Sequence, residues 1–167
     1  MCNNEIVLYP NEILKSKTKS VDDVNSEEIQ NYIDDLLNTM NAYNHCVGLA
    51  ANQIGINYQI FVADASKNKS CNMSHGLIIA VNPKVTVSEG TEISREGCMS
   101  VPDLTGNVTR SVQLEFEARD RNGEVFNLSV NGFEARVIQH EIDHLNGKVF
   151  LDRVKSARDV YSRKKYR

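Results

Sequence analysis

The chain has 167 residues, which is about the length of one domain. Hydrophobic residues make up 41% of it and charged residues 25%, as in an ordinary globular protein with one apolar core. These values exclude a collagen-like or disordered chain, and no apolar run approaches the roughly 20 residues that a membrane helix needs. The net charge of −3 argues against binding nucleic acid through bulk charge. We therefore expect one domain over residues 1–167, with no membrane segment and no sequence-specific binding to nucleic acid.

Basic residues are concentrated at the C-terminal end. Residues 153–167 contain seven lysines and arginines against a single acidic residue, Asp159. The simpler interpretation is a solvated helix end, because cations suit the negative end of the helix dipole. The alternative is a weak contact with an anionic partner such as ribosomal RNA.

The cysteines indicate the compartment. Cys2, Cys46, Cys71 and Cys98 show no C-x-x-C spacing, and residues 1–10 lack the basic and apolar regions of a secretory signal. Disulfides persist mainly in oxidising compartments, so we expect a cytoplasmic protein with reduced thiols. Each cysteine is then either a small buried residue or a functional thiol.

The first predicted element is an N-terminal helix. Asn25 is a suitable N-cap, and Glu28 three residues later would complete a capping box. Apolar residues follow at helical spacing, at Ile29, Ile33, Leu36, Leu37 and Met40.

The middle of the chain predicts strands. Residues 112–119 alternate apolar and polar side chains, as in a half-buried strand, and Asn122-Gly123 supplies a hairpin turn into a strand over 124–130. Segments rich in β-branched residues predict strands at 58–64, 77–82 and 84–88, while 66–74 predicts a surface loop. A second helix is expected from about Asn131, with Glu134 in its capping box and Gly147 after its end. Strands followed by a late helix predict an α+β fold.

The second predicted helix contains an H-E-x-x-H motif, formed by His140, Glu141 and His144. Residues four apart lie on one helix face, so the two histidines can hold one metal ion between them. Glu141 lies beside them, where a metal could lower the pKa of a water and the carboxylate could take its proton. The simpler interpretation is a helix that happens to carry two histidines, with Glu141 in solvent.

A catalytic site of this kind needs a third protein ligand. The metzincin pattern would place a histidine at position 150, which is Phe150, and no glutamate or histidine follows His144. These absences argue against an ordinary zinc metallopeptidase. The third ligand must lie upstream, among His45, His75 and the cysteines, unless it is Asp152 or Asp159.

Two upstream segments are suited to such a site. Cys98 follows Gly97, which would let the backbone approach closely, and a thiolate favours a softer ion such as Fe(II) or Zn(II). Taken alone, Cys98 would more often be a core cysteine. In the other segment, small residues from Gly48 lead to Gln53, whose amide could stabilise an oxyanion; the alternative is a packing turn.

Together, GLAANQ at 48–53, EGCMS at 96–100 and QHEIDH at 139–144 resemble the three motifs of peptide deformylases, in order and in spacing. The resemblance covers most of the chain, from Tyr9-Pro10 to Phe150. It implies an α+β fold with antiparallel sheets packed around a central helix that carries the H-E-x-x-H motif, together with an N-terminal helix. It also implies a hydrolase that removes the N-formyl group from the initiator methionine of nascent polypeptides and releases formate.

The resemblance assigns roles to individual residues. Cys98, His140 and His144 would hold one divalent metal ion, generally Fe(II), with zinc, nickel or cobalt as replacements. Glu141 would be the general base and then the acid that protonates the leaving amine. Gln53 and the backbone N–H of Met99 would bind the formyl oxygen as it becomes an oxyanion.

The resemblance also extends to the substrate pocket. Val47, Phe133 and Val137 would line the pocket for the methionine side chain, and the backbone of Gly48 would pair with the peptide.

Two positions depart from the usual motifs GxGLAAxQ and EGCLS. Methionine in place of leucine changes the volume little, so we expect Met99 to be tolerated. Cys46 replaces the first glycine, and we expect it to alter access to the cleft or sensitivity to oxidation.

Two other functions are compatible with the same motifs. A cleft narrowed at Cys46 would allow another small amide as substrate. A binding protein could instead keep the metal for structure alone. Glu141 argues against the second alternative, because a structural site needs ligands but no base.

Overall fold

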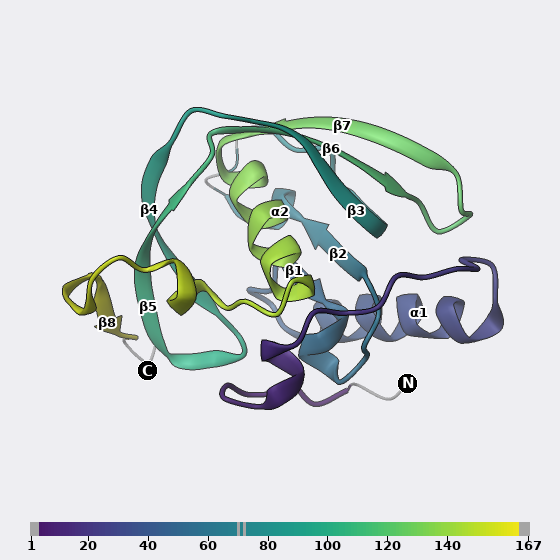
Figure 1. Cartoon of the computed structure of the whole chain (residues 1–167), viewed down its shortest axis with the longest axis horizontal. Helices are drawn as coiled ribbons and strands as arrows, with labels where there is room; N and C mark the ends of the chain where they lie inside the picture. The colour runs from purple at the N-terminus through teal and green to yellow at the C-terminus, as the bar shows by residue number, and fades with distance from the viewer. Residues whose placement is uncertain (1–3, 70, 72, 164–167) are drawn as a thin grey trace.

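The computed structural model describes residues 4–69, 71 and 73–163, and it has an α+β fold (Figure 1). A five-stranded antiparallel sheet has the strand order β1 (Gly48–Ala50), β2 (Ile60–Asp64), β3 (Leu77–Glu89), β6 (Gln113–Arg119) and β7 (Val125–Asn131). A three-stranded antiparallel sheet has the order β4 (Glu92–Cys98), β5 (Val101–Arg110) and β8 (Val160–Ser162). The helices are α1 (Glu27–Ala42) and α2 (Gly132–Leu145). Short 3-10 turns are η1 (Glu12–Lys15), η2 (Ala51–Ile54), η3 (Ala65–Lys67), η4 (Phe150–Arg153) and η5 (Ala157–Asp159).

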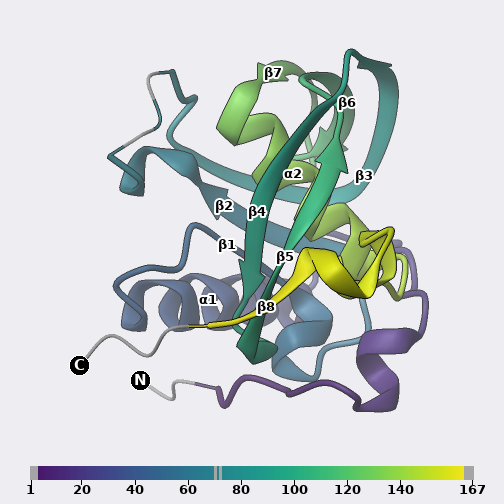
Figure 2. The same cartoon turned by 90° about the vertical axis from the view of Figure 1, so that its left-hand side faces the viewer.

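Helix α2 lies at the centre, between the larger sheet and the β4–β5 hairpin (Figures 1 and 2). Its apolar residues Ala135, Ile138 and Leu145 are buried in one cluster with Phe61 and Phe116 of the larger sheet. Burial of this apolar stripe fixes the rotation of the helix about its axis. The opposite face, which carries the two motif histidines, is thereby turned toward β4.

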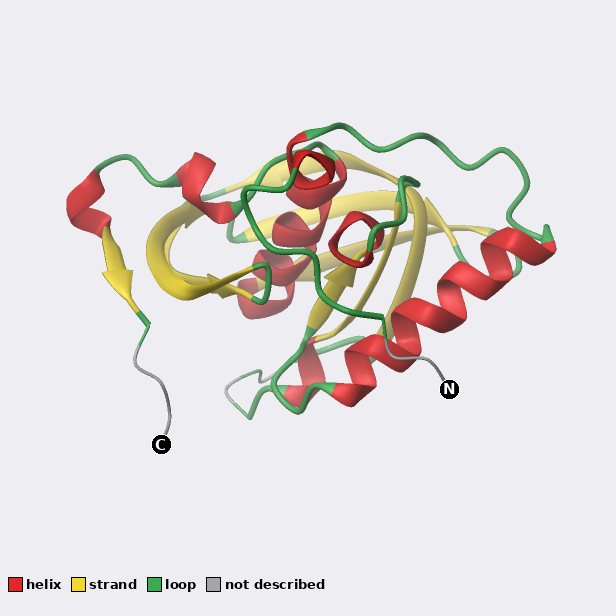
Figure 3. Cartoon of the chain, turned by 90° about the horizontal axis from the view of Figure 1, so that it is seen from below, coloured by secondary structure: helices red, strands yellow, loops and turns green. Residues whose placement is uncertain are grey.

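Helix α1 covers the β1–β2 end of the larger sheet, and Figure 3 shows it along the side of the molecule opposite β8. Four of the five predicted apolar positions are buried there, and Leu37 packs against the same cluster. The predicted capping box is wrong, because the helix begins after Ser26. Asn25 instead donates its N–H to Asp23 Oδ1 at 2.9 Å, and Glu28 Oε1 accepts the hydroxyl of Tyr32 at 2.9 Å.

The β6–β7 hairpin confirms the predicted strands and their turn, with Gly123 at φ 84°. The strands predicted at 77–82 and 84–88 are instead one irregular strand, β3, with Asn82 at φ 52°. The Asn82 side chain exchanges two 2.8 Å hydrogen bonds with the backbone of Val21, which stabilises this conformation. The β4–β5 hairpin was not predicted, because buried charged residues such as Glu96 and Arg110 interrupt its apolar pattern.

The sequence predicted the C-terminal end of α2 correctly but not the cap at its N-terminal end. Gly147 follows the helix end with φ 72°, as expected for a residue that must adopt the left-handed conformation. The capping box with Glu134 is wrong. That buried carboxylate instead accepts hydrogen bonds from the backbone N–H and Nδ1 of His75, at 2.9 and 2.7 Å, and so attaches the preceding loop to the helix.

As far as Arg163, the C-terminal segment is not the end of an α-helix, which corrects the simpler interpretation of its basic residues. It forms η4, η5 and β8, and β8 pairs with β5. Cys2 and the basic residues Lys164, Lys165 and Arg167 lie outside the described residues. Neither described helix combines the length and the apolarity that a membrane span requires.

Candidate metal centre and active site

The structure brings together Cys98, His140 and His144. The two histidines lie one turn apart on α2, with ring centroids 4.9 Å apart, and Cys98 ends β4 with its Sγ 3.2 Å from Nε2 of His144. One ligand atom from each residue lies within 4.8 Å of the others. A sulfur and two imidazole nitrogens at this spacing suit a divalent ion such as zinc or ferrous iron.

The other residues considered as third ligands are placed elsewhere. His75 pairs with Glu134, Asp152 accepts the N–H of Val149 at 2.8 Å, and Asp159 accepts the amide of Asn107 at 3.1 Å. His45 lines the pocket but is not in the group of potential ligands. Within the described part of the chain, Cys98 is therefore the residue that completes the histidine pair.

Cys98 reaches this position through a local irregularity in the β4–β5 hairpin. Gly97 pairs with Thr105, but Cys98 pairs with Val101, so the register shifts between them and the chain turns tightly through Met99 and Ser100. Burial would raise the pKa of the Cys98 thiol, but the adjacent imidazoles of His144 and His140 lower it well below its usual range. The sulfur is thus suited to act as a thiolate ligand.

A buried network of ion pairs contacts the Nδ1 side of the His140 ring. Glu96 Oε2 lies 3.0 Å from His140 Nδ1, and the same carboxylate accepts two hydrogen bonds from Arg110 and one from Arg136, all at 2.9–3.0 Å. Arg110 also binds Asp143, which Arg153 contacts in turn at 2.5 Å. Burial alone would raise the pKa of Glu96, but its contacts with His140 and Arg110 lower it below its usual value. A carboxylate on the second ring nitrogen fixes the orientation of a ligating histidine.

Sequence reasoning missed this network. Glu96 lies in the EGCMS motif and Asp143 in the QHEIDH motif, so their places in the motifs could have indicated a role at the site. Arg110, Arg136 and Arg153 gave no such signal, because isolated arginines are usually solvated.

Glu141 is buried at the base of the pocket, beside the three potential ligands. Its Oε2 has no hydrogen-bond partner among the described residues, and its carboxylate faces Gly48 of β1. Burial raises its pKa to about 7, although the neighbouring histidines oppose this shift. A carboxylate with such a pKa can both take and return a proton near neutral pH.

Gln53 is buried on the other side of the group, in η2. Its Oε1 accepts the N–H of Ala50 at 2.9 Å, while its Nε2 donates to Ser100 Oγ at 3.2 Å and contacts Cys98 Sγ at 3.4 Å. These contacts hold an amide donor beside the sulfur, as oxyanion stabilisation requires.

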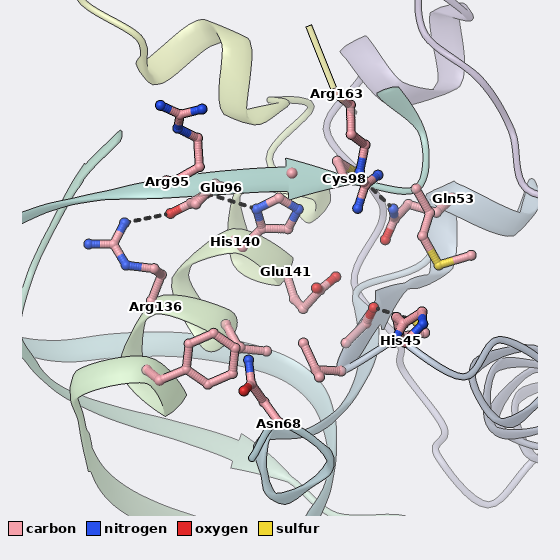
Figure 4. Close-up of a pocket in the computed structure, with 17 residues that line it drawn as sticks. His45, Gln53, Asn68, Arg95, Glu96, Cys98, Arg136, His140, Glu141 and Arg163 are labelled. Atoms are coloured by element: carbon pink, nitrogen blue, oxygen red, sulfur yellow. Dashed lines mark hydrogen bonds and ion pairs between the residues drawn. The ribbon is translucent and has the colours of Figure 1, made fainter. Parts of the chain in front are cut away.

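A cavity of about 290 Å³ opens onto these groups (Figure 4). It is lined by the predicted site residues Val47, Gly48, Gln53, Cys98, Met99, Phe133, Val137, His140 and Glu141, while His144 is fully buried beneath it. Figure 4 shows His140 and Glu141 entering from α2, with Cys98 and Gln53 on the opposite side.

Cys46, at the unusual motif position, also lines this cavity but is itself buried. Its thiol donates to the carbonyl of Gly48 at 3.1 Å, and burial raises its pKa to about 12. The side chain is therefore a neutral hydrogen-bond donor to the strand beside Glu141.

A buried carboxylate next to a Cys-His-His group, inside a cavity on an α+β scaffold, defines a metal-dependent hydrolase. The family model for polypeptide deformylase matches residues 3–160. The chain belongs to the polypeptide deformylase family, whose members use a metal ion to remove formyl groups from nascent peptides.

Individual relatives support this membership. The peptide deformylase of Thermodesulfovibrio yellowstonii is 37% identical over 98% of this chain and 96% of its own. That of Aquifex aeolicus is 40% identical over 97% and 94%. The crystal structure of a peptide deformylase from Legionella pneumophila has a TM-score of 0.84 at 35% identity, covering 95% of this chain and 89% of that one. The enzyme from Synechococcus elongatus, in complex with actinonin, has a TM-score of 0.82 at 32% identity, covering 93% and 81%.

Proposed function

We propose that this chain carries out deformylation of nascent formyl-methionyl peptides in the pocket described above, with residues 1–167 forming one catalytic domain. The observation that carries the proposal is the position of Glu141, a buried carboxylate without a partner among the described residues, beside Cys98, His140 and His144. A purely structural metal site would need the three ligands, but it would not need a carboxylate that acts as a base.

Cys98, His140 and His144 would hold one divalent ion, and we assign Fe(II) as the ion in the cell. Zinc, nickel or cobalt would occupy the same site in purified protein, because all of them accept sulfur and imidazole ligands. When bound, the ion supplies Lewis acidity to the formyl group and to a water molecule. A ferrous ion held by a thiolate would also make the enzyme sensitive to oxygen during purification.

The residues around the ion would then divide the proton and charge transfers. Glu141 takes a proton from the attacking water and passes it to the leaving amine, a role that its buried position beside the three potential ligands supports. Gln53 Nε2 and the backbone N–H of Met99 stabilise the negative charge on the formyl oxygen. The fixed amide of Gln53 supports this role, because donors that are already oriented cost little reorganisation.

The substrate peptide would bind along β1. This strand is at the edge of the five-stranded sheet, so one side of Gly48 is not paired within the sheet and can accept a peptide backbone as an added strand. Val47, Phe133 and Val137 line the cavity with apolar surface suited to a methionine side chain.

The decisive experiment measures formate release from formyl-Met-Ala-Ser by protein purified without oxygen, with its metal assayed in the same sample. We expect release at about one metal per chain. Glu141→Gln should keep the metal and lose turnover by at least about 100-fold, the lower range for general acid–base catalysis. Metal-loaded protein that releases no formate would refute the proposal, and a fully active Glu141→Gln variant would remove Glu141 from the mechanism.

We also propose that the enzyme works in the cytoplasm and that its basic tail, residues 153–167, contacts the ribosome weakly. The support is the charge of the tail and the nascent peptide as substrate. Co-sedimentation with ribosomes should be weak and should disappear at high salt, because counterion release drives such binding. Equal sedimentation of a chain truncated after Ser162 would contradict a role for the four basic residues that this truncation removes.

A further inference from the structure

The C-terminal strand β8 brings the positively charged side chain of Arg163 to the active-site pocket. β8 pairs with β5, and the pairing continues as the N–H of Arg163 donates to the carbonyl of Asp103 at 2.8 Å. The Arg163 side chain lines the cavity beside Gly97, where an added Cβ would lie 3.4 Å from its Nη2. Figure 4 shows its guanidinium reaching toward Cys98 and Gln53 from the end of β8.

Arg95 lies on the same face of the three-stranded sheet. Gly97 pairs with Thr105, which pairs with Tyr161. Arg95 lies two residues before this cross-strand row on β4 and Arg163 two residues after it, directly past the end of β8, so the two arginines lie on either side of the row. The guanidinium of Arg95 stacks 3.6 Å from the centre of the Tyr161 ring, and its Nε donates to Asn107 at 3.3 Å. These contacts hold Arg95 in place without neutralising its charge.

The mouth of the pocket, where Arg95 and Arg163 lie, carries an excess of positive charge. Arg136 is paired with Glu96, a carboxylate that it shares with Arg110 and His140, and Glu141 lies buried at the base of the pocket. Among the described residues, neither Arg95 nor Arg163 takes part in an ion pair. Two cations at the mouth of a partly enclosed cavity attract an anionic group on an incoming ligand.

We propose that Arg163, supported by Arg95, binds a carboxylate of the formylated peptide downstream of its methionine, so that this enzyme favours substrates with an acidic group there. The inference rests on the proposed function, because it concerns the choice among formyl-peptides. Arg163 is a specificity residue in it and takes no part in the chemistry.

The test compares amidated formyl-methionyl peptides that carry Asp or Asn at the second, third or fourth position. At one position or more, the wild-type enzyme should show a kcat/KM about two- to fivefold higher for Asp, the range of an exposed ion pair. The preference should appear in KM and shrink at high salt. Arg163→Gln should bring the ratio to about 1, and Arg163→Glu should reverse it.

Arg158→Gln is the matched control, because Arg158 is an exposed arginine of the same segment that does not line the cavity. It should retain the wild-type ratio. A wild-type ratio of 1 at all three positions, with no Arg163-dependent preference between the free acid and the amide of formyl-Met-Ala-Ser, overturns the inference. The same ratio in Arg163→Gln as in the wild type also overturns it, while formate release from the Asn peptides still supports the proposed function. No release from any peptide overturns both.

The carboxylate could come from an acidic side chain or from the free end of a short peptide. Formyl-Met-Ala-Ser as the free acid and as the amide separates these sources. A preference that depends on Arg163 in this pair alone assigns the site to a terminal carboxylate. A preference in the Asp peptides assigns it to acidic side chains.

Discussion

Gly48 and Glu141 are so close that an added Cβ on Gly48 would stand 2.5 Å from Oε1 of the carboxylate. The edge strand β1 thus forms one wall of the space that holds the proposed base. Glycine is needed there because the backbone and the carboxylate share this space, and not because of an unusual φ angle.

Gly48→Ala is therefore expected to displace Glu141 and to lower kcat/KM by about 100-fold or more, because a misplacement of about 1 Å can have an effect of that size. The metal content should stay normal, since the three atoms that an added Cβ would approach most closely all belong to Glu141 and none to a potential ligand. Formate release and metal analysis on the same sample test both statements. Full activity of the variant would show that the carboxylate can move without loss.

Cys98→Ser should lose metal, because a serine hydroxyl stays protonated where the thiol becomes a thiolate. We expect clearly less than one metal per chain after gel filtration. Cys71→Ser is the control, since Cys71 is a free cysteine outside the ligand group. Normal metal content in Cys98→Ser would show that the third ligand lies elsewhere.

Glu96→Gln is expected to destabilise the fold by about 3 kcal/mol, because it leaves buried cations of the network without their shared anion. The exposed pair of Asp34 with Arg121, at 2.7 Å, provides the comparison. Asp34→Asn should cost less than about 1 kcal/mol. Urea unfolding of the metal-loaded proteins measures both changes, and equal costs would mean that burial gives the network no special weight.

Cys46 is expected to resist alkylation at pH 8, although it lines the pocket. With burial raising its pKa to about 12, the thiol stays protonated at this pH, and the reactive thiolate forms only as the pH rises toward that value. Iodoacetamide labelling followed by mass spectrometry should modify Cys71, which is more exposed, well before Cys46. Rapid labelling of Cys46 would instead support the sequence-based expectation that this position alters access to the cleft or sensitivity to oxidation.

The extent of sequence prediction differed between the two parts of the site. His140, Glu141 and His144 follow from helical periodicity, because residues four apart on a helix must share a face. Cys98 was a candidate among several, and its selection came from resemblance to a family. The hairpin that delivers it was not predicted, since its inward-facing residues include Glu96 and Arg110, whose burial depends on partners distant in the chain.

The sequence by itself thus determined the α+β class, the two helices and the β6–β7 hairpin, which depend on local periodicity. It also determined which side chains of the three short motifs are available for the site. Only the tertiary structure decided that Glu96 holds His140, that Gly48 confines Glu141 and that β8 carries Arg163 to the pocket. The reason is physical: ion pairing and close packing act through space, between segments that the chain order does not connect. Only the folded chain brings such groups within a few ångströms of each other.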